Sequence, residues 1–256
     1  MKIAILGAGN MGGAIARGLA QGGLVATKDI TVTNPSVGKL DKLKAEYPEI
    51  NVSTDNSVAS EADMVIIAVK PWKVEEVVKP LHLRRPQIVV SVAAGISFDT
   101  LKEYVDKDMT LFRVIPNTAI SCLASTTLIA ECNASTEQTQ MLLDLFNEMG
   151  LSILIEEKQM TAATALTSCG IAFVLKYVQA AMQAGVEVGI RPKDAMKMLA
   201  QTLDGAAQLL LTDENTHPVI EIDKVTTPGG ITIKGVNQLD HDGFTSAVIN
   251  AVKACM

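Results

Sequence analysis

The first twenty residues constrain the fold of this chain more than any other stretch. An apolar run, Ile3-Ala4-Ile5-Leu6, precedes the glycine-rich turn Gly7-Ala8-Gly9-Asn10-Met11-Gly12, and a small-residue helical pattern follows. Strand, glycine turn and helix in this order are the context in which G-x-G-x-x-G binds a dinucleotide. Gly7 permits the tight turn, Gly9 leaves room for a pyrophosphate, and Gly12 lets the helix pack closely on the strand. This order favours dinucleotide binding over the alternative, a glycine turn without a ligand.

The amino-acid composition indicates the number of domains and argues against nucleic acid as a binding partner. The chain has 256 residues, of which 48% are hydrophobic and only 4% aromatic, so aliphatic side chains must build the core of one large or two modest domains. The formal charge is −6 and the nearest thing to a basic cluster is Arg84-Arg85, so nucleic acid is not an expected partner.

The cysteines and the apolar segments indicate in which cellular compartment the protein is expected. Cys122, Cys132, Cys169 and Cys255 show no C-x-x-C spacing, which predicts reduced thiols, no metal site and a cytoplasmic protein. The N-terminus lacks the pattern of a signal peptide. The longest apolar segment, residues 162–178, is interrupted by Thr, Ser, Gly and Lys, so we expect a buried helix rather than a membrane span.

Alternating strands and helices fill the first 157 residues, and helical patterns fill the rest. Strands are expected at 3–6, 30–33, around Val52, and at 64–69, 87–92, 110–115, 126–130 and 153–155, with a helix at 137–149 between the last two. Helices are expected from about 161 to 189, with bends at Gly170 or Gly185, from 192 to about 211, and at 233–239 and 243–254. The predicted fold is α/β: a Rossmann dinucleotide-binding domain, residues 1–157, followed by an all-helical domain, residues 158–256. The helical domain has much apolar surface, which favours a homodimer over a closed monomeric bundle.

The ends of the strands carry the polar residues of a cofactor crevice. The second strand ends in Asn34-Pro35-Ser36 rather than in the carboxylate that accepts from an NAD ribose, which favours NADPH. No arginine stands there, so NADH stays open, and only Ser36, Lys39 and Lys42 could assist. Lys70 follows the strand at 64–69 and is expected in the same crevice, although a solvated lysine is the simpler alternative.

A second informative stretch is Thr226-Thr227-Pro228-Gly229-Gly230-Ile231-Thr232. A helix is expected to follow it, with the N–H groups of residues 230–232 free to bind a carboxylate or phosphate and three threonine hydroxyls nearby. An ordinary capped turn is the alternative. The three histidines lie apart, and no carboxylate dyad or Ser-His-Asp set is visible. Hydride transfer suits this inventory because the cofactor carries the difficult step.

With these stretches in hand, the sequence resembles the pyrroline-5-carboxylate reductase family over almost its whole length. The matching segments are Gly7 to Gly12, Ala68-Val69-Lys70-Pro71, Ser91-Val92-Ala93-Ala94-Gly95-Ile96, Pro116-Asn117-Thr118 and, most specifically, Val225 to Thr232. The resemblance implies reduction of the ring C=N of 1-pyrroline-5-carboxylate to L-proline by NAD(P)H. It also implies a Rossmann domain followed by a helical dimerisation domain, with an oligomer larger than a dimer left open.

The resemblance also implies the site residues. The cofactor would be held by Gly7, Ala8, Gly9, Asn10, Met11, Gly12, Asn34, Asn56, Ala68, Val69, Lys70, Pro71, Ala93, Ala94 and Gly95. The substrate would be held by Thr226, Thr227, Gly229, Gly230, Ile231 and Thr232. The Thr232 hydroxyl would hydrogen-bond the ring nitrogen and ease its protonation, which makes it the one catalytic residue expected.

Several positions depart from the family pattern. Pro35 stands where the family has an arginine, Ala119 replaces a proline, and Thr167-Ser168-Cys169-Gly170-Ile171-Ala172-Phe173 replaces Ser-Gly-Ser-Gly-Pro-Ala-Tyr. Without that proline the long helix is expected to continue more regularly. Two rival functions stay open: a reductase of the β-hydroxyacid dehydrogenase type with Lys176 as proton donor, and a non-catalytic dinucleotide-binding regulator.

Overall fold

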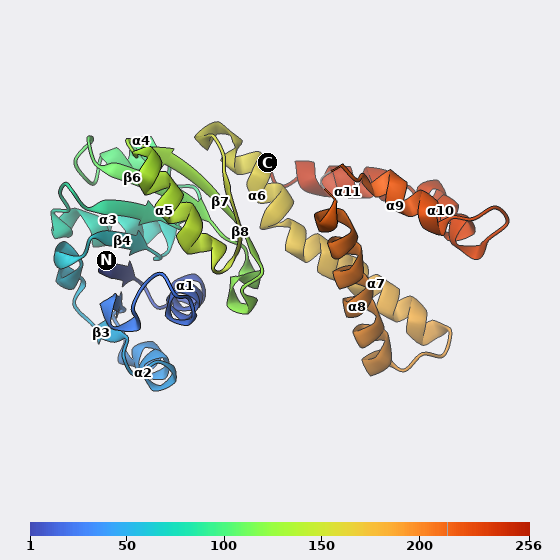
Figure 1. Ribbon diagram of the computed structural model, residues 1–256, viewed down its shortest axis with the longest axis horizontal. Coiled ribbons are helices and arrows are strands. Elements are labelled where there is room, and N and C mark those ends of the chain that lie inside the picture. Colours follow the sequence, from blue (N-terminus) through green and yellow to red (C-terminus); the bar gives the residue numbers. More distant parts are fainter. Residues whose placement is uncertain (214) are drawn as a thin grey trace. The chain divides into compact units, whose positions relative to one another are not determined.

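The computed structural model describes residues 1–213 and 215–256, which form two compact units, Met1–Ser168 and Cys169–Met256 (Figure 1). The first unit contains the whole predicted Rossmann domain and one further helix, α6 (Met160–Thr167). Met160 and Ala165 of α6 are buried, and α6 packs against the sheet of that unit. Packing therefore places α6 in the first unit, which ends eleven residues beyond the boundary predicted at 157/158.

Eight strands form one sheet in the order β3-β2-β1-β4-β5-β6-β7-β8. All neighbours are parallel except β6 and β7, which are antiparallel. The order 3-2-1-4-5-6 is that of a Rossmann fold, with its switch point between β1 and β4. The strands are β1 (Ile3–Leu6), β2 (Ile30–Thr33), β3 (Asn51–Ser53), β4 (Met64–Ile67), β5 (Ile88–Ser91), β6 (Thr110–Ile115), β7 (Ser125–Cys132) and β8 (Gly150–Leu154).

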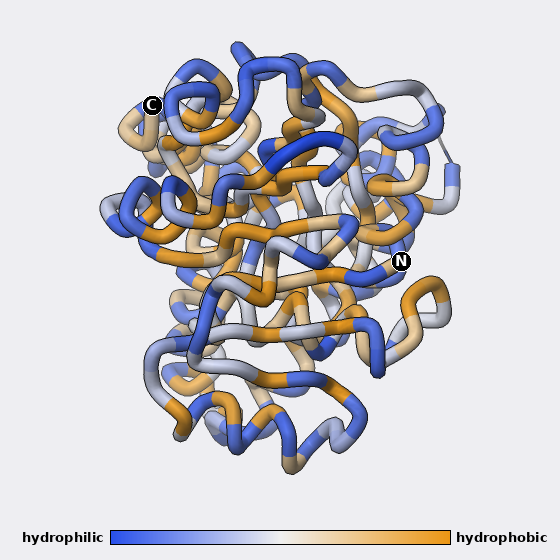
Figure 2. Tube along the Cα trace, turned by 90° about the vertical axis from the view of Figure 1, so that its left-hand side faces the viewer, coloured by the Kyte–Doolittle hydropathy of each residue, from blue (hydrophilic) through white to orange (hydrophobic). Residues whose placement is uncertain are grey.

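Helices cover both faces of this sheet. One face packs against α1 (Asn10–Gln21), α2 (Val37–Glu46) and α5 (Thr136–Asn147), and the other against α3 (Val74–Val78), α4 (Phe98–Lys102) and α6. The two faces use alternate residues of each strand, such as Ile3 and Ile5 against Ala4 and Leu6. The central strands β1, β4 and β5 are fully buried, which explains their apolar runs, whereas β3 and β8 at the two edges of the sheet are partly exposed. Apolar residues are drawn in orange in Figure 2. The predicted strands are all present, but β7 and β8 begin earlier than expected.

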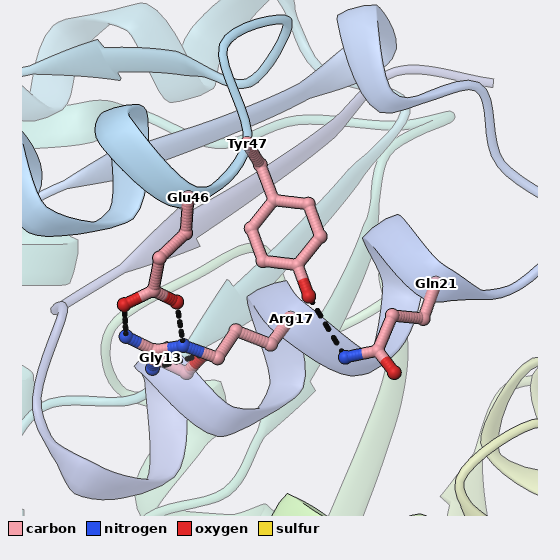
Figure 3. Close-up of polar contacts among 5 residues, drawn as sticks. All are labelled: Gly13, Arg17, Gln21, Glu46 and Tyr47. Carbon is pink, nitrogen blue, oxygen red and sulfur yellow. Dashed lines mark hydrogen bonds and ion pairs between the residues drawn. The ribbon is translucent and has the colours of Figure 1, made fainter.

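An ion pair fixes α1 against the end of α2. The Arg17 guanidinium donates to both carboxylate oxygens of Glu46, at 2.5 and 3.0 Å, and Arg17 Nη1 also donates to the Gly13 carbonyl at 3.2 Å (Figure 3). The bond from Arg17 lowers the pKa of Glu46 below its usual value. One turn further along α1, Gln21 donates to the Tyr47 hydroxyl at 2.8 Å. These contacts hold in register the two helices that follow the glycine turn and β2.

The second unit is entirely helical in its described residues. It contains α7 (Gly170–Glu187), α8 (Pro192–Thr212), α9 (Pro218–Val225), α10 (Ile231–His241) and α11 (Phe244–Lys253). The helical segment divides at Ser168 and Cys169 as the glycine signal at 170 suggested, whereas Gly185 leaves α7 continuous. A Cβ at Gly185 would make only ordinary contact with that of Ala195 in α8, at 3.5 Å.

The expectation that the long apolar helix is buried is wrong within one chain. No residue of α7 is buried, and Leu175 is 61% exposed. The stretch Glu157–Glu187 is long and apolar enough to cross a membrane by length and composition, and only 6% of its most apolar window is buried. Its apolar surface must therefore be covered by something outside the described chain.

Candidate functional site

The carboxyl ends of the parallel strands meet at one edge of the sheet. Three backbone bonds join them there: Gly7 N–H donates to Thr33 at 2.8 Å, Ala68 N–H to Leu6 at 2.9 Å, and Val92 N–H to Ile67 at 3.0 Å. The edge brings together the segments in which sequence reasoning placed the cofactor, namely Gly7 to Gly12, Asn34, Asn56, Ala68 to Pro71 and Ala93 to Gly95. Ligands of open α/β sheets bind at this edge, beside the switch point.

The glycine turn has the geometry that a pyrophosphate site requires. Gly7 has φ +106°, and a Cβ there would lie 2.8 Å from the Ala68 carbonyl oxygen. A Cβ on Gly12 would collide with the Gly7 carbonyl oxygen, so this position keeps α1 close to the turn. A Cβ on Gly9 would meet no atom within 4 Å, so the turn is open where a ligand must approach. No side chain caps α1, and helix N-termini of this kind bind phosphate.

Two consecutive residues at the end of β2 tie this turn to its surroundings. The Asn34 Oδ1 accepts from Ala8 N–H at 3.2 Å, and Asn34 Nδ2 donates to the carbonyl and hydroxyl oxygens of Ser36, both at 2.9 Å. The backbone N–H of Ala8 is therefore hydrogen-bonded within the protein. The buried Thr33 hydroxyl donates to Asn56 Oδ1 at 2.5 Å. Sequence reasoning named Asn34 and Asn56 but missed Thr33, whose only sequence signal is a polar residue ending an apolar strand.

The ends of β4 and β5 complete the edge. Lys70 is exposed, and the described residues give its ammonium no hydrogen-bond or ion-pair partner. Gly95 has φ +78°, and a Cβ there would meet open space. Trp72, two residues beyond Lys70, is 75% exposed. Sequence reasoning passed over this residue, although a single tryptophan next to a strand end is a visible signal.

The Pro-Gly-Gly turn lies in the second unit and leads into α10 as expected. Two of the groups expected to be free for a ligand are bonded within the protein. Gly230 N–H donates to the Thr227 carbonyl at 2.9 Å, and the Thr226 hydroxyl donates to the Ile222 carbonyl at 3.0 Å. No side chain caps α10, and within the described chain the exposed Thr232 hydroxyl has no hydrogen-bond partner. The amides that open α10 and the Thr232 hydroxyl therefore remain for a ligand.

Residues 167–173, where the sequence differs from the family pattern, do not form the regular helix that the absence of the proline predicted. A turn at Ser168 and Cys169 separates α6 from α7. The buried Asn117, at the carboxyl end of β6, donates from Nδ2 to the Thr167 carbonyl at 3.3 Å and fixes the end of α6. Desolvation, with a smaller contribution from the Cys255 thiol, raises the pKa of Cys169, so this thiol stays protonated at neutral pH.

Two hollows elsewhere in the first unit do not coincide with the edge that carries the predicted cofactor residues. Two hollows of the first unit open at the amino-terminal ends of the strands, one beside Gln87 and Thr110 and one beside Lys2 and Asn51, and none of the predicted site residues lines them. No group of three or more His, Cys, Asp or Glu side chains among the described residues could hold a metal ion.

Comparison with known proteins identifies the family. A model of pyrroline-5-carboxylate reductase dimerisation matches residues 157–256, and one of NADP oxidoreductases described as coenzyme F420-dependent matches residues 2–95. Pyrroline-5-carboxylate reductase 2 of Dictyostelium discoideum is 37% identical, over 98% of this chain and 89% of its own length. The chain belongs to the pyrroline-5-carboxylate reductase family. It spans 48% of the length of another relative, pyrroline-5-carboxylate reductase 1 of the same organism, which is also 37% identical.

Solved structures agree with this assignment. The 1-pyrroline-5-carboxylate reductase of Streptococcus pyogenes superimposes with a TM-score of 0.88 at 31% identity, covering 100% of this chain and 96% of that one. The Plasmodium falciparum pyrroline carboxylate reductase, solved with NADP bound, gives a TM-score of 0.88 at 26% identity, covering 100% and 95%. The fold, the family and the class of nicotinamide-dependent oxidoreductase predicted from the sequence are confirmed. The dimerisation model spans the exposed apolar helices, which supports the expected homodimer.

Proposed function

We propose that this chain reduces the C=N bond of 1-pyrroline-5-carboxylate to L-proline with NADPH as the preferred hydride donor. One observation carries the proposal: this chain, a member of the family, contains both an open glycine turn at Gly9 and an uncapped N-terminus of α10 with the free Thr232 hydroxyl. The first feature suits a pyrophosphate, and the second suits a small carboxylate.

The roles of the substrate residues follow from their chemistry. The N–H groups of Ile231 and Thr232, which open α10, hold the substrate carboxylate, since a helix N-terminus favours an anion, whereas Gly230 N–H is already bonded to the Thr227 carbonyl. The Thr232 hydroxyl hydrogen-bonds the ring nitrogen and orients it, and it assists protonation as that atom becomes an amine. When bound, the reduced nicotinamide supplies the hydride that the adjacent carbon receives.

The cofactor residues favour a phosphorylated ribose. Asn34 places a neutral carboxamide where an NAD-type site has a carboxylate, and the exposed Lys39 and Lys42 add positive charge along α2. Pro35 supplies no cation, so the hydrogen-bond donors proposed for the ribose at the end of β2 are the neutral side chains of Ser36 and Asn56. The preference for NADPH over NADH is therefore expected to be moderate.

The first rival, a β-hydroxyacid dehydrogenase, requires a lysine that protonates a carbonyl oxygen. The candidate Lys176 lies exposed on α7 and donates to Gln179 in the next turn at 2.9 Å. Because the Lys176 ammonium is engaged on its own helix, Thr232 is the better supported candidate for the catalytic residue. The second rival, a non-catalytic regulator, predicts dinucleotide binding without turnover.

A direct assay tests the proposed function. The purified chain is mixed with 1-pyrroline-5-carboxylate and either NADPH or NADH, and oxidation of the cofactor is followed by absorbance. We expect turnover with both and a higher kcat/KM with NADPH. Absence of turnover with both cofactors, together with intact dinucleotide binding, would favour the regulator, and turnover of a 3-hydroxyacid instead would favour the dehydrogenase.

A charge on the exposed face of α7 is expected to dissociate the homodimer. Leu175→Asp places a carboxylate on an apolar surface that α7 leaves uncovered within one chain, and burying an unpaired charge costs several kcal/mol. Analytical ultracentrifugation should show a shift from dimer to monomer, whereas Lys176→Ala, next to it on the same helix, serves as the matched control. A Leu175→Asp variant that stays dimeric would place the interface on other helices.

A further inference from the structure

Two thiols of the second unit lie close together. Cys169 lies in the turn before α7, and Cys255 lies in the turn after α11. Helices α7 and α11 pack against each other, and the Cys169 and Cys255 thiols lie within hydrogen-bonding reach of one another. Two of the four cysteines therefore form a pair, although they are far apart in the sequence.

The position of the pair suits a covalent bridge. A disulfide requires Cβ atoms about 3.8 Å apart, and thiols within hydrogen-bonding reach approach this geometry with little rearrangement. Neither cysteine lies within a helix, so a small shift of either backbone breaks few helical hydrogen bonds. Cys255 is exposed and open to an oxidant, whereas Cys169 is half-buried and, because its pKa is raised by desolvation, stays a thiol at neutral pH.

We propose that Cys169 and Cys255 form a reversible intrachain disulfide when the protein meets a peroxide. The Cys255 sulfur attacks the peroxide, the O–O bond breaks, and the products are a sulfenic acid and one water. The Cys169 thiol then attacks that sulfur, the S–O bond breaks, and a second water leaves with the proton of the thiol. The peroxide gains the two electrons that the thiol pair loses. A small-molecule dithiol returns the pair to its reduced form by thiol–disulfide exchange.

A bridge at this place stabilises the helical unit. The loop that it closes contains the helices from α7 to α11. A crosslink over so long a loop restricts the unfolded chain strongly, so it favours the folded unit. Formation of the disulfide should therefore raise the melting temperature by several degrees.

Peptide mapping of the full chain tests the inference. The reduced protein is treated with hydrogen peroxide, free thiols are blocked with iodoacetamide, and a tryptic digest is analysed by mass spectrometry without reduction. We expect peptide 159–176, which contains Cys169, to be linked to peptide 254–256, which contains Cys255, and dithiothreitol to separate them. Non-reducing electrophoresis should show a single chain, and the melting temperature should rise on oxidation and fall back on reduction.

Serine variants give the matched controls. Cys169→Ser and Cys255→Ser should each lack the link and the rise in melting temperature, whereas Cys122→Ser, which changes an exposed cysteine of the first unit, should keep both. Three outcomes would overturn the inference: oxidation of Cys255 beyond the sulfenic acid with Cys169 still free, a link to another cysteine or to a second copy of the chain, or no reaction of either thiol. A Cys169–Cys255 link without a rise in melting temperature would overturn its stabilising role.

Discussion

Replacement of Thr232 with alanine is expected to lower kcat by about 10²-fold, the lower range for loss of a group that assists proton transfer. The hydroxyl stands at the first turn of α10, exposed and without a hydrogen-bond partner in the described part of the chain, so its removal breaks no structural contact. The dissociation constant of NADPH should stay nearly unchanged, because the predicted cofactor residues lie in the first unit. Steady-state kinetics and calorimetry on the same preparation separate the two quantities.

Two further variants show whether the loss belongs to the hydroxyl at this position. Thr232→Ser keeps the hydroxyl and should recover most of the rate. Thr202→Ala removes another exposed threonine of the same unit, whose hydroxyl donates to the Met198 carbonyl on α8 at 2.9 Å, and should leave kcat within about twofold. If Thr232→Ala loses cofactor binding instead of turnover, this residue belongs to the cofactor site and the assigned role is wrong.

The parts of the fold that depend on local sterics were predictable. Gly7 and Gly12 sit where the sequence placed a tight turn and a close helix contact, because both requirements follow from the absence of a Cβ. The burial of β1, β4 and β5 followed from their apolar runs. Because neighbouring parallel strands share one edge at their carboxyl ends, the sequence alone predicts that Asn34 and Lys70 lie at the same edge.

The missed features depend on contacts between distant residues or on a second molecule. The bond from Thr33 to Asn56 joins residues on different elements and depends on the packing of η2 beside β1 and β2. The apolar surface of the helical domain predicted a homodimer, but hydrophobic periodicity does not say which helix the partner covers, so the exposure of α7 within one chain was missed. Helix α9 begins at Pro218, since proline is favoured in a first helical turn, and His217 accepts from Val219 N–H.

Substitution of Gly9 should abolish dinucleotide binding without unfolding the protein. Gly9 has φ −71° and ψ −171°, a conformation open to any residue, and a Cβ there would meet no protein atom within 4 Å. The side chain of Gly9→Val would instead occupy the space that the pyrophosphate requires. We expect the dissociation constant of NADPH to rise by at least about 100-fold, as pyrophosphate contacts to the uncapped N-terminus of α1 are lost, with the melting temperature nearly unchanged.

The same turn contains a variant with the opposite outcome. Gly12→Ala would drive its Cβ into the Gly7 carbonyl oxygen and close to Ala68, so it should lower the melting temperature by several degrees before any ligand is added. Gly23→Ala, beyond the other end of α1, makes only ordinary contact with Glu148 at 3.8 Å and should change neither quantity. Glycines separated by two residues would then fail for different reasons: Gly9 because a ligand must approach the backbone, and Gly12 because the backbone approaches itself. Retained NADPH affinity in Gly9→Val would show that the pyrophosphate does not lie over this turn.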